Sequence, residues 1–481
     1  MYDIAIIGAG VTGAMTAYYL SKYEGKVAVL EAGSDVASGT TKANSAIVHA
    51  GFDAKPGTKK AALNVKGCAM MEALTERLGV HYKKCGSYVL GFSEGDRERL
   101  EELKARGEAN GVPELSILSG EELRAKEPTL SEEVKWALHA PTAGIVCPYD
   151  LTLALAENAA SNGTEFYFDF PVRTVRREGD SYVLSDGTRE VSARYVVNAA
   201  GLASAEVAGI LGEKDFPVTI LPRRGEYMLL DRAEGSFVTA TMFVLPDERG
   251  KGILVSPTVD GNLIVGPNAQ LVEDREDRST TDAGLAEIAA GARRIAPGVN
   301  LRQVITSFAG VRSTPSTGDF YLEISSQCPH VIHAVGIESP GLASSPAVGE
   351  YIVSLLRQDG FALAPKENCV EERRPGGNRP LFRDLTAAEK QARIEEDPAY
   401  GKIVCRCETI TEGDILDAIR RPVGARNLDM VKRRVRAGMG RCQGGFCSPR
   451  VAELLASELK VPLSTITKTG GGSYLLTEKT K

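Results

Sequence analysis

The early part of the chain alternates short apolar runs with helical stretches. Residues 2–7 and 26–30 are nearly continuous apolar runs, which is typical of strands buried in a parallel sheet. A helical stretch over residues 14–23 separates them, and residues 151–162 predict a later helix. Further strands are expected at residues 171–175, at 182–184, and in a run that ends at 195–201. This part of the chain therefore predicts an α/β fold.

The middle of the chain has a different pattern. Between residues 216 and 310, apolar and polar positions alternate, and proline and glycine turns separate the runs. We expect an antiparallel sheet here, with strands at residues 221–230, 252–256 and 262–266. From about residue 365 to 401 the composition becomes polar and rich in turn formers, which indicates a linker or an arm before a further unit.

Composition narrows the classes of protein. A chain of 481 residues is expected to form two or three domains, and 43% hydrophobic with 25% charged residues is typical of a soluble globular protein. The formal net charge of −6 argues against a nucleic-acid-binding surface over the whole molecule. No apolar run reaches the roughly 18–20 residues of a membrane span, and the N-terminus leaves no room for a signal peptide. We expect a cytoplasmic protein, with peripheral association with a membrane left open.

The nine cysteines are distributed unevenly. Their number and the length of the chain do not suggest a secreted disulfide framework. Four of them crowd into the last eighty residues. Five are scattered singly and are expected to be small buried hydrophobic residues: Cys68, Cys85, Cys147, Cys328 and Cys369.

A glycine-rich turn, residues 8–13, lies between the first strand and the first helix. Gly8 allows a tight turn, Gly10 lets the backbone approach a pyrophosphate, and Gly13 lets the helix pack closely on the strand. The helix start offers unpaired N–H groups to phosphates, and Glu31 at the end of the second strand can accept ribose hydroxyls. This is a dinucleotide-binding fingerprint. The acid disfavours NADP, but the motif alone does not separate FAD from NAD.

The following segments favour FAD. Residues 38–45 form a small, hydroxyl-rich loop, residues 47–51 read Ile-Val-His-Ala-Gly, and residues 195–201 end in Asn-Ala-Ala-Gly. With these motifs the chain resembles the D-amino-acid-oxidase-like flavoproteins, in the branch of the glycerol-3-phosphate and L-2-hydroxyglutarate dehydrogenases. The resemblance implies a Rossmann-like α/β FAD domain with an antiparallel-sheet substrate domain. The FAD-binding parts would be about 1–80, 145–212 and 305–365, and the substrate-domain parts about 81–144 and 213–304.

The resemblance also implies site residues. His49 would lie beside the flavin ring and act as the catalytic base, and Arg312 would hold the acidic group of the substrate. Arg223, Arg224 and Tyr227 are candidates to face the substrate. The alternatives are a structural role for His49, a surface ion pair for Arg312, and exposure to solvent for Arg223 and Arg224. FAD contacts are expected at Gly8, Gly10, Val11, Thr12, Gly13, Glu31, Ala32, Thr40, Thr41, Ser45, His49, Val172, Ala200, Gly201, Gly310, Arg312, Gly341, Leu342 and Ala343.

The last four cysteines predict a metal centre. Cys405 and Cys407 form a Cys-x-Cys pair, and Cys442 and Cys447 form a Cys-x4-Cys pair. Zinc is an alternative, but Cys-x-Cys is tight for a zinc knuckle. The segment also resembles the bacterioferritin-associated-ferredoxin-like (BFD-like) [2Fe–2S] domain, although the best-known members have a shorter Cys-x2-Cys. The resemblance implies a small, mainly helical domain over residues 401–481, after a linker or arm over 366–400.

Many basic residues surround these cysteines. A solvated basic face or a nucleic-acid patch are alternatives, but cations near a four-thiolate cluster would favour its reduction. The residues are Arg420, Arg421, Lys432, Arg433, Arg434, Arg436, Arg441 and Arg450.

Together the two resemblances imply an FAD-dependent dehydrogenase that oxidises sn-glycerol 3-phosphate to dihydroxyacetone phosphate. Its electrons would pass through FAD and a [2Fe–2S] cluster to a partner or acceptor. An L-2-hydroxyglutarate dehydrogenase, an amine or opine dehydrogenase, and an electron-transfer subunit without its own substrate are the alternatives. The expected partners are a small anionic substrate and flavoprotein or electron-transfer subunits, with membrane association only through a partner and no nucleic acid.

Overall fold

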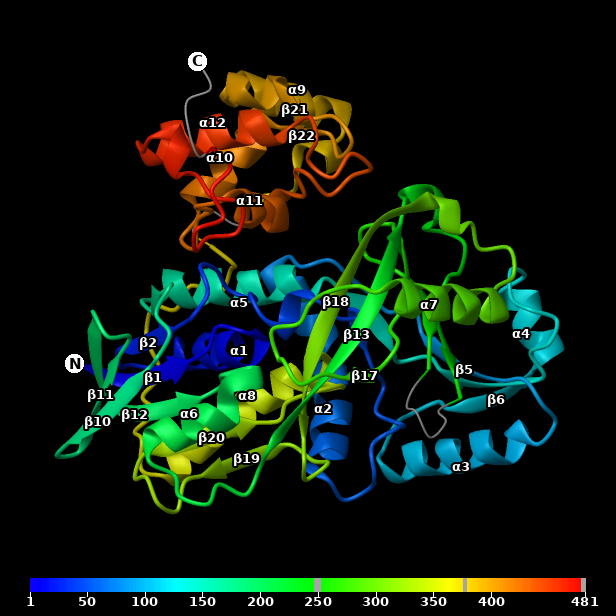
Figure 1. Ribbon diagram of the computed structural model, residues 1–481, viewed down its shortest axis with the longest axis horizontal. Helices are drawn as coiled ribbons and strands as arrows, with labels where there is room; N and C mark the ends of the chain where they lie inside the picture. Colours follow the sequence, from blue (N-terminus) through cyan, green and yellow to red (C-terminus); the bar gives the residue numbers. More distant parts are fainter. Residues whose placement is uncertain (246–251, 375–378, 477–481) are drawn as a thin grey trace.

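A large sheet forms the core of the first unit (Figure 1). The computed structural model describes residues 1–245, 252–374 and 379–476. The sheet has the order β10-β11-β12-β1-β2-β9, and β20 pairs with β12 and β19. Its strands are β1 (Tyr2–Ile7), β2 (Val27–Leu30), β9 (Glu165–Tyr167), β10 (Thr174–Glu178), β11 (Ser181–Ser185), β12 (Glu190–Asn198), β19 (Tyr321–Ile324) and β20 (Val331–Val335). The pairs β1–β2, β1–β12, β2–β9 and β12–β20 are parallel, as the apolar runs predict.

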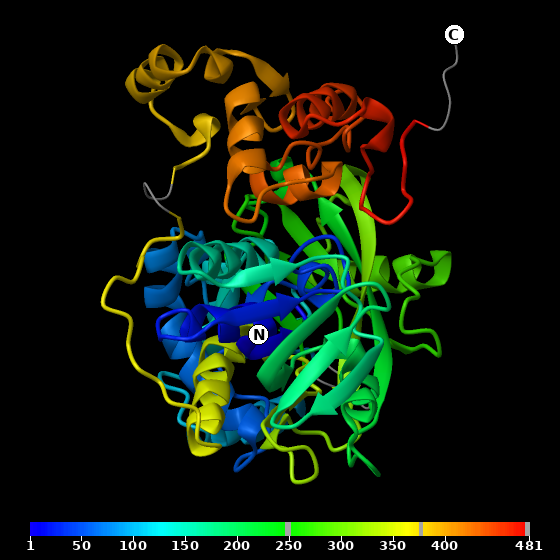
Figure 2. The same ribbon diagram turned by 90° about the vertical axis from the view of Figure 1, so that its left-hand side faces the viewer.

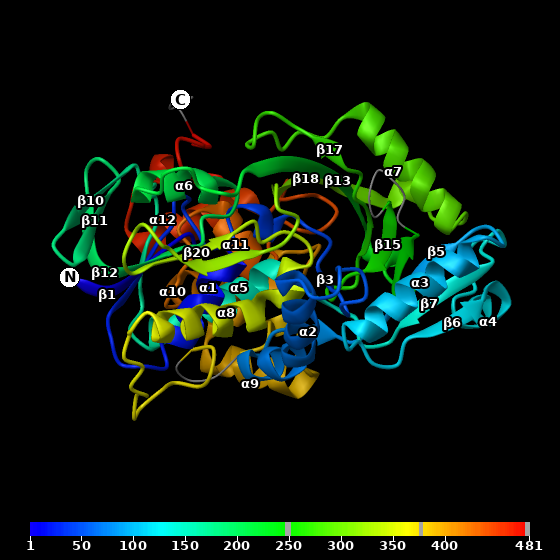
Figure 3. The same cartoon turned by 90° about the horizontal axis from the view of Figure 1, so that it is seen from below.

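Helices cover this sheet. Helix α1 is buried along nearly its whole length, which its apolar sequence requires. Figure 3 shows α2 and α8 side by side below it, and α5 lies on the side that faces the C-terminal domain. These helices are α1 (Val11–Leu20), α2 (Lys59–Leu78), α5 (Pro148–Ser161), α6 (Ser204–Leu211) and α8 (Gly341–Gln358).

A second sheet stands beside the first, in the order β17-β13-β16-β15-β14-β5-β7-β6, with β18 paired to β13. Its strands are β5 (Ser87–Gly91), β6 (Ser116–Ser119), β7 (Trp136–Ala140), β13 (Ile220–Leu230), β14 (Thr241–Val244), β15 (Leu254–Pro257), β16 (Leu263–Gly266), β17 (Gln270–Leu271) and β18 (Val304–Pro315). Helices α3 (Asp96–Ala109), α4 (Gly120–Lys126) and α7 (Asp282–Ile295) pack on it. The sheet is largely antiparallel, as the alternating pattern predicts; among its described strands, only β14 and β5 pair in parallel.

Two features connect the two units. Strand β18, at the start of the stretch 305–365 that was expected to bind FAD, pairs with β13 in the second sheet. A small sheet of β3 (Ile47–Val48), β4 (Tyr82–Lys83) and β8 (Gly144–Val146) joins the two units. The long pairing of β13 with β18 places both strands between the two units.

The C-terminal domain forms a separate layer over the rest of the chain (Figure 2). It contains β21 (Ile403–Cys405), β22 (Ile410–Thr411), α10 (Glu412–Arg420), α11 (Leu428–Val435) and α12 (Ser448–Leu459) around its own hydrophobic core. The segment predicted as a linker is partly folded: it contains α9 (Ala387–Glu396), whose first turn has a capping box at Thr386. Residues 246–251, 375–378 and 477–481, which fall within the predicted sheet, linker and C-terminal domain, lie outside the described residues.

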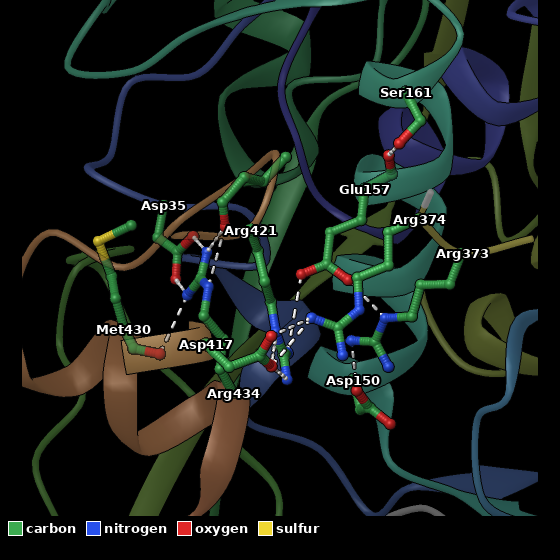
Figure 4. A network of polar contacts seen from close by, with 11 residues as sticks. Asp35, Asp150, Glu157, Ser161, Arg373, Arg374, Asp417, Arg421, Met430 and Arg434 are labelled. Atoms are coloured by element: carbon green, nitrogen blue, oxygen red, sulfur yellow. Dashed lines mark hydrogen bonds and ion pairs between the residues drawn. The ribbon is translucent and has the colours of Figure 1, made fainter. Parts of the chain in front are cut away.

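Buried ion pairs fix the C-terminal domain in place (Figure 4). Residues 364–374, here called the strap, run along α5 before the domain begins. Arg373 in the strap binds Glu157 and Asp150 of α5, and Arg374 binds Asp417 of α10. Because these side chains are largely withdrawn from water, removing one partner would leave a buried charge without compensation. The domain is therefore clamped to the first unit.

Candidate functional site

A cavity of about 990 Å³ opens at the carboxyl ends of β1 and β2, where open α/β sheets bind their ligands. Its size suits an extended cofactor. Most of the predicted FAD contacts line it: Gly8, Gly10, Val11, Thr12, Glu31, Ala32, Thr40, Thr41, Ser45, His49, Val172, Ala200, Gly201, Arg312, Gly341 and Leu342.

The remaining predicted contacts support the cavity wall from behind. A Cβ on Gly13 would lie 1.9 Å from the carbonyl oxygen of Gly8, so only glycine lets α1 pack against the turn. A Cβ on Gly310 would lie 1.9 Å from the carbonyl oxygen of Ala43, and Ala343 is buried in a core cluster. These three residues shape the site but are not among the residues that line the cavity.

The turn at Gly8 has the conformation that the fingerprint needs. Gly8 has a φ of +103°, and a Cβ there would lie 2.5 Å from the carbonyl oxygen of Ala199. Glu31 accepts hydrogen bonds from the backbone N–H groups of Ala9 (2.7 Å) and Gly33 (2.8 Å). Burial raises the pKa of Glu31, and these two backbone donors oppose that rise. The acid is thus held at the cavity wall, where the fingerprint places the ribose.

The hydroxyl-rich loop is tied to both sides of the cavity. The backbone N–H of Val11 donates to Thr41 Oγ1 at 3.1 Å, which joins the loop to the start of α1. The hydroxyl of Thr40 donates to the carbonyl oxygen of Val311 on β18 at 2.6 Å. Small hydroxyl side chains therefore lie next to the helix N-terminus, which is a natural phosphate site.

A second cavity of about 590 Å³ adjoins the first. His49, Arg312 and the segment 338–340 line both cavities, so they mark the junction where a flavin ring and a substrate would meet. The His49 ring stacks on Phe243, with centroids 5.4 Å apart, and Asn64 donates to the His49 carbonyl oxygen at 2.7 Å. These contacts hold the imidazole at the junction.

Arg223 and Arg312 both line the second cavity. They are directly opposite each other in the β13–β18 ladder, so their side chains emerge on the same face of the sheet. Within the described residues, the structure gives neither guanidinium an ion pair. Like charges in this arrangement repel each other, and an anion between them would offset the repulsion.

Tyr227 and Arg224 have different surroundings. Tyr227 lines the first cavity, stacks on Phe308 and has its hydroxyl 3.4 Å from Ser45 Oγ. Arg224 lines neither cavity; its guanidinium binds Asp277 and Glu226. Side chains alternate along a strand, so residue 224 points to the face opposite the one on which 223 and 227 face the cavities. This geometry favours Arg223 over its neighbour Arg224 as a substrate-facing residue.

Four further charged residues line the cavities although the sequence analysis did not predict them there. Lys60 and Glu338 both line the second cavity and form an ion pair of 2.8 Å. Lys42 and Arg433 line the first cavity, although Arg433 belongs to the C-terminal domain. Lys42 lies within the hydroxyl-rich loop, and its place there is a signal for it. Arg433 was predicted only as one of the basic residues near the cysteines, and no local signal places it at this cavity.

The four predicted cluster cysteines come together as two pairs. The sulfur atoms of Cys407 and Cys442 are 3.6 Å apart. A hydrogen bond from Cys447 lowers the pKa of the Cys405 thiol to about 6, which favours the thiolate form that binds metal. In the described part of the chain, no three His, Cys, Asp or Glu side chains are grouped to hold one ion. Two pairs suit two bridged irons better than one tetrahedral zinc, so the donor set fits the cluster.

The basic residues near these cysteines do not form the expected cationic shell. Arg420 binds Glu458, Arg436 binds Glu408, and Arg450 binds Glu412. Arg433 and Arg434 bind Asp35 of the first unit. Most of these charges are therefore neutralised by acids that are remote in the sequence, and several hold the domain in place.

Comparison with known families agrees with this geometry. Residues 3–355 match the family model described as FAD dependent oxidoreductase. The chain belongs to this family. Residues 403–457 of this FAD-dependent oxidoreductase match the model of the BFD-like [2Fe-2S] binding domain. The two predicted resemblances, the fold class and the two cofactors are thereby confirmed.

Individual relatives cover most or all of the oxidoreductase. It is 46% identical over 481 residues to a glycerol 3-phosphate dehydrogenase of Caloramator mitchellensis, covering 100% of this chain and 99% of that protein. It is similar to the solved L-α-glycerophosphate oxidase of Mycoplasma pneumoniae with FAD bound, with a TM-score of 0.73, 29% identity, and coverage of 77% and 98%. Human mitochondrial L-2-hydroxyglutarate dehydrogenase is 28% identical over 74% of this chain and 89% of that protein.

Among residues 1–245, 252–374 and 379–476, no helix is long and apolar enough to cross a bilayer.

Proposed function

We propose that this FAD-dependent oxidoreductase converts sn-glycerol 3-phosphate to dihydroxyacetone phosphate and passes the electrons through its [2Fe–2S] domain to an acceptor. The main support is the pair Arg223 and Arg312, which faces one cavity beside His49. A phosphate monoester carries close to two negative charges at neutral pH and has three acceptor oxygens, so it matches two guanidinium groups. The relatives named for glycerol 3-phosphate support the same substrate.

The side chains at the junction have different roles in the reaction. Arg223 and Arg312 bind the phosphate and orient the carbon that bears the secondary hydroxyl toward the first cavity. His49 accepts the proton of that hydroxyl as the C–H bond breaks. FAD, when bound, supplies the acceptor for the two electrons and the hydrogen of that bond. Tyr227, at the wall of the first cavity, helps to exclude water from the junction.

The cysteine pairs complete the electron path. The reduced flavin holds two electrons. An acceptor of single electrons needs a centre between them that takes one electron at a time, and a [2Fe–2S] cluster does this. Cys407 is exposed and Cys405 is buried, so the cluster would reach the surface at one side. An electron-transfer protein or a small-molecule acceptor would meet it there. A partner of this kind also accounts for any association with a membrane, and the protein is expected to work in the cytoplasm.

An anaerobic titration of the full-length holoprotein tests the substrate. Glycerol 3-phosphate is expected to bleach the visible absorbance of the oxidised flavin, and glycerol, which lacks the phosphate, is expected to do so only at far higher concentration. Bleaching by L-2-hydroxyglutarate but not by glycerol 3-phosphate would replace the proposal with that activity. Bleaching by an amine or opine alone would point to those substrates, and no bleaching by any of them would indicate an electron-transfer subunit.

A further inference from the structure

The C-terminal domain reaches into the wall of the flavin cavity. Arg433, on α11, and Thr469 line the cavity together with residues 31–34 at the end of β2. Asn427 Nδ2 lies 3.2 Å from Ser34 Oγ, and the Ser34 hydroxyl donates to the carbonyl oxygen of Thr469 at 2.8 Å. The cavity is therefore closed at this end by a domain that begins some four hundred residues after the fingerprint.

At this wall, Arg433 and Arg434 share a single carboxylate, so the positive charge of the two guanidinium groups exceeds the negative charge that binds them. Asp35 is 1% exposed, and its two oxygens accept from both terminal nitrogens of Arg434 at 3.0 and 2.8 Å. Asp35 also accepts from Arg433, at 2.9 Å from Nη2. In the described part of the chain, the structure gives the Arg433 side chain no other hydrogen-bond acceptor. One carboxylate thus faces two guanidinium groups, and only Arg433 borders the cavity.

Other cations gather around the same space. Lys42 and Arg278 line the cavity as well, and Arg278 comes from the second unit. Burial, together with the nearby charges of Arg433 and Arg278, lowers the pKa of Lys42 to about 8. Lys42 follows Thr41, whose side chain binds the start of α1, so these cations lie beside the helix N-terminus. Cations from three units of the chain therefore line this part of the cavity, and of these Arg278 is paired with Glu276, which lines it too.

We infer that the cluster domain supplies Arg433 as a binding residue for the diphosphate of FAD. The diphosphate is the anionic part of the cofactor, and a guanidinium recognises such oxygens with two parallel hydrogen bonds. This inference rests on the flavin half of the proposed function and is independent of the substrate. The FAD-bound oxidase of M. pneumoniae is matched by only 77% of this chain, so Arg433 adds affinity to a site that the first unit largely forms.

The test compares two probes that differ by the diphosphate, ADP and adenosine, on the full-length protein after removal of FAD. Arg433→Met is expected to weaken ADP binding about tenfold and to leave adenosine binding unchanged. Arg433→Lys keeps a cation and is expected to retain most of the ADP affinity. Arg450→Met is the matched control: Arg450 lies in the same domain but pairs with Glu412 and Glu453 away from the cavity. Calorimetry gives the dissociation constants, and iron content reports the integrity of the domain.

Two outcomes would overturn the inference. Equal ADP affinity in Arg433→Met and in the unsubstituted protein would show that the guanidinium does not meet the diphosphate. The second outcome is that Arg433→Met loses ADP binding and adenosine binding to the same extent, while Arg433→Lys keeps both. It would show that Arg433 only docks the domain through Asp35. Neither outcome depends on glycerol 3-phosphate, so failure here and failure of the proposed activity are separate results.

Discussion

Arg223 and Arg312 lie opposite each other on neighbouring antiparallel strands and point into one cavity without an ion pair among the described residues. Replacing either with Met is expected to raise KM for glycerol 3-phosphate by about ten- to a hundredfold, because a charge-assisted hydrogen bond to the phosphate is lost. The turnover of saturated enzyme should change less. Steady-state kinetics with an artificial electron acceptor measures both constants.

The exposed Arg302, which precedes β18 and lines neither cavity, provides the control. Arg302→Met should behave as the unsubstituted protein. An equal loss toward glycerol and glycerol 3-phosphate in Arg312→Met would contradict phosphate recognition by this residue.

His49 is expected to act in the chemical step. His49→Gln should slow reduction of the flavin by substrate by about 10²–10⁴-fold, because no side chain at that place would accept the hydroxyl proton. FAD content should be unchanged. Stopped-flow absorbance of the flavin under anaerobic conditions measures the rate. His139→Gln is the comparison, since His139 stacks on Tyr88 in the second sheet and borders neither cavity. A similar slowing in both variants would indicate a general structural effect.

Asp35 should anchor the C-terminal domain. Asp35→Ala leaves the Arg434 side chain, which is 0% exposed, without its counter-ion, and is expected to lower the free energy of unfolding by about 3–5 kcal/mol. Burial would raise the pKa of Asp35, but Arg434 and Arg433 outweigh it and hold the pKa below its usual range. The stabilisation is therefore complete above the unfolded pKa of about 3.9 and is lost as pH falls through the lower folded value.

Urea unfolding of the full-length protein measures this change in the free energy of unfolding. Asp429→Ala serves as the control, because Asp429 pairs with the half-exposed Lys468 within the domain and should contribute no more than about 1 kcal/mol. Equal effects of the two substitutions would rule out a special role for Asp35.

FAD binding should weaken as pH rises through about 8, because Lys42 in the flavin-free protein loses its proton there. Bound diphosphate favours the charged lysine, so binding takes up a proton, and affinity should fall by at most about tenfold per pH unit. The flavin-free protein should instead gain stability from about pH 8 toward the unfolded lysine pKa of about 10.4, since its unfolded state then holds more protons. Fluorescence of released flavin measures the affinity. A Lys42→Met protein should lose this dependence; an unchanged slope would assign it to another group.

Substitution of a cluster cysteine should remove iron and leave flavin. Cys407→Ala or Cys442→Ala breaks one of the two sulfur pairs and is expected to abolish bound iron and sulfide. FAD absorbance should persist, with the affinity reduced if the domain loosens around Arg433. Cys85→Ala, far from the pairs in sequence, should keep full iron content. Zinc in place of iron and sulfide in the unsubstituted protein would contradict the cluster.

Local sequence signals predicted the parts of the site that are built locally. The turn at Gly8, the acid Glu31 and the Cys-x-Cys pair each depend on residues within one short segment, and the family comparisons confirm the cofactors that these motifs indicate. The sequence could not choose between Arg223 and Arg224, because strand pairing fixes which of two adjacent arginines faces the cavity.

Long-range pairs were out of reach of the sequence. Arg433 meets Asp35 across 398 positions, and Arg373 meets Glu157 across 216. The arginines near the cysteines gave no sign that two of them, Arg433 and Arg434, pair with an acid of the first unit. Such pairings depend on how the domains dock, which periodicity and spacing do not encode.

The strap restricts movement of the C-terminal domain relative to the rest of the chain. Arg373 binds α5 and Arg374 binds α10 of the domain, Met439 lies 3.5 Å from the Tyr149 hydroxyl, and Arg441 reaches Gln303 at 3.1 Å. An electron that leaves the flavin would find the cluster already in position, with no diffusive search by a tethered module. The rate of electron transfer from the flavin to the cluster should then be independent of solvent viscosity. A more viscous solvent should slow only the encounter with the external acceptor.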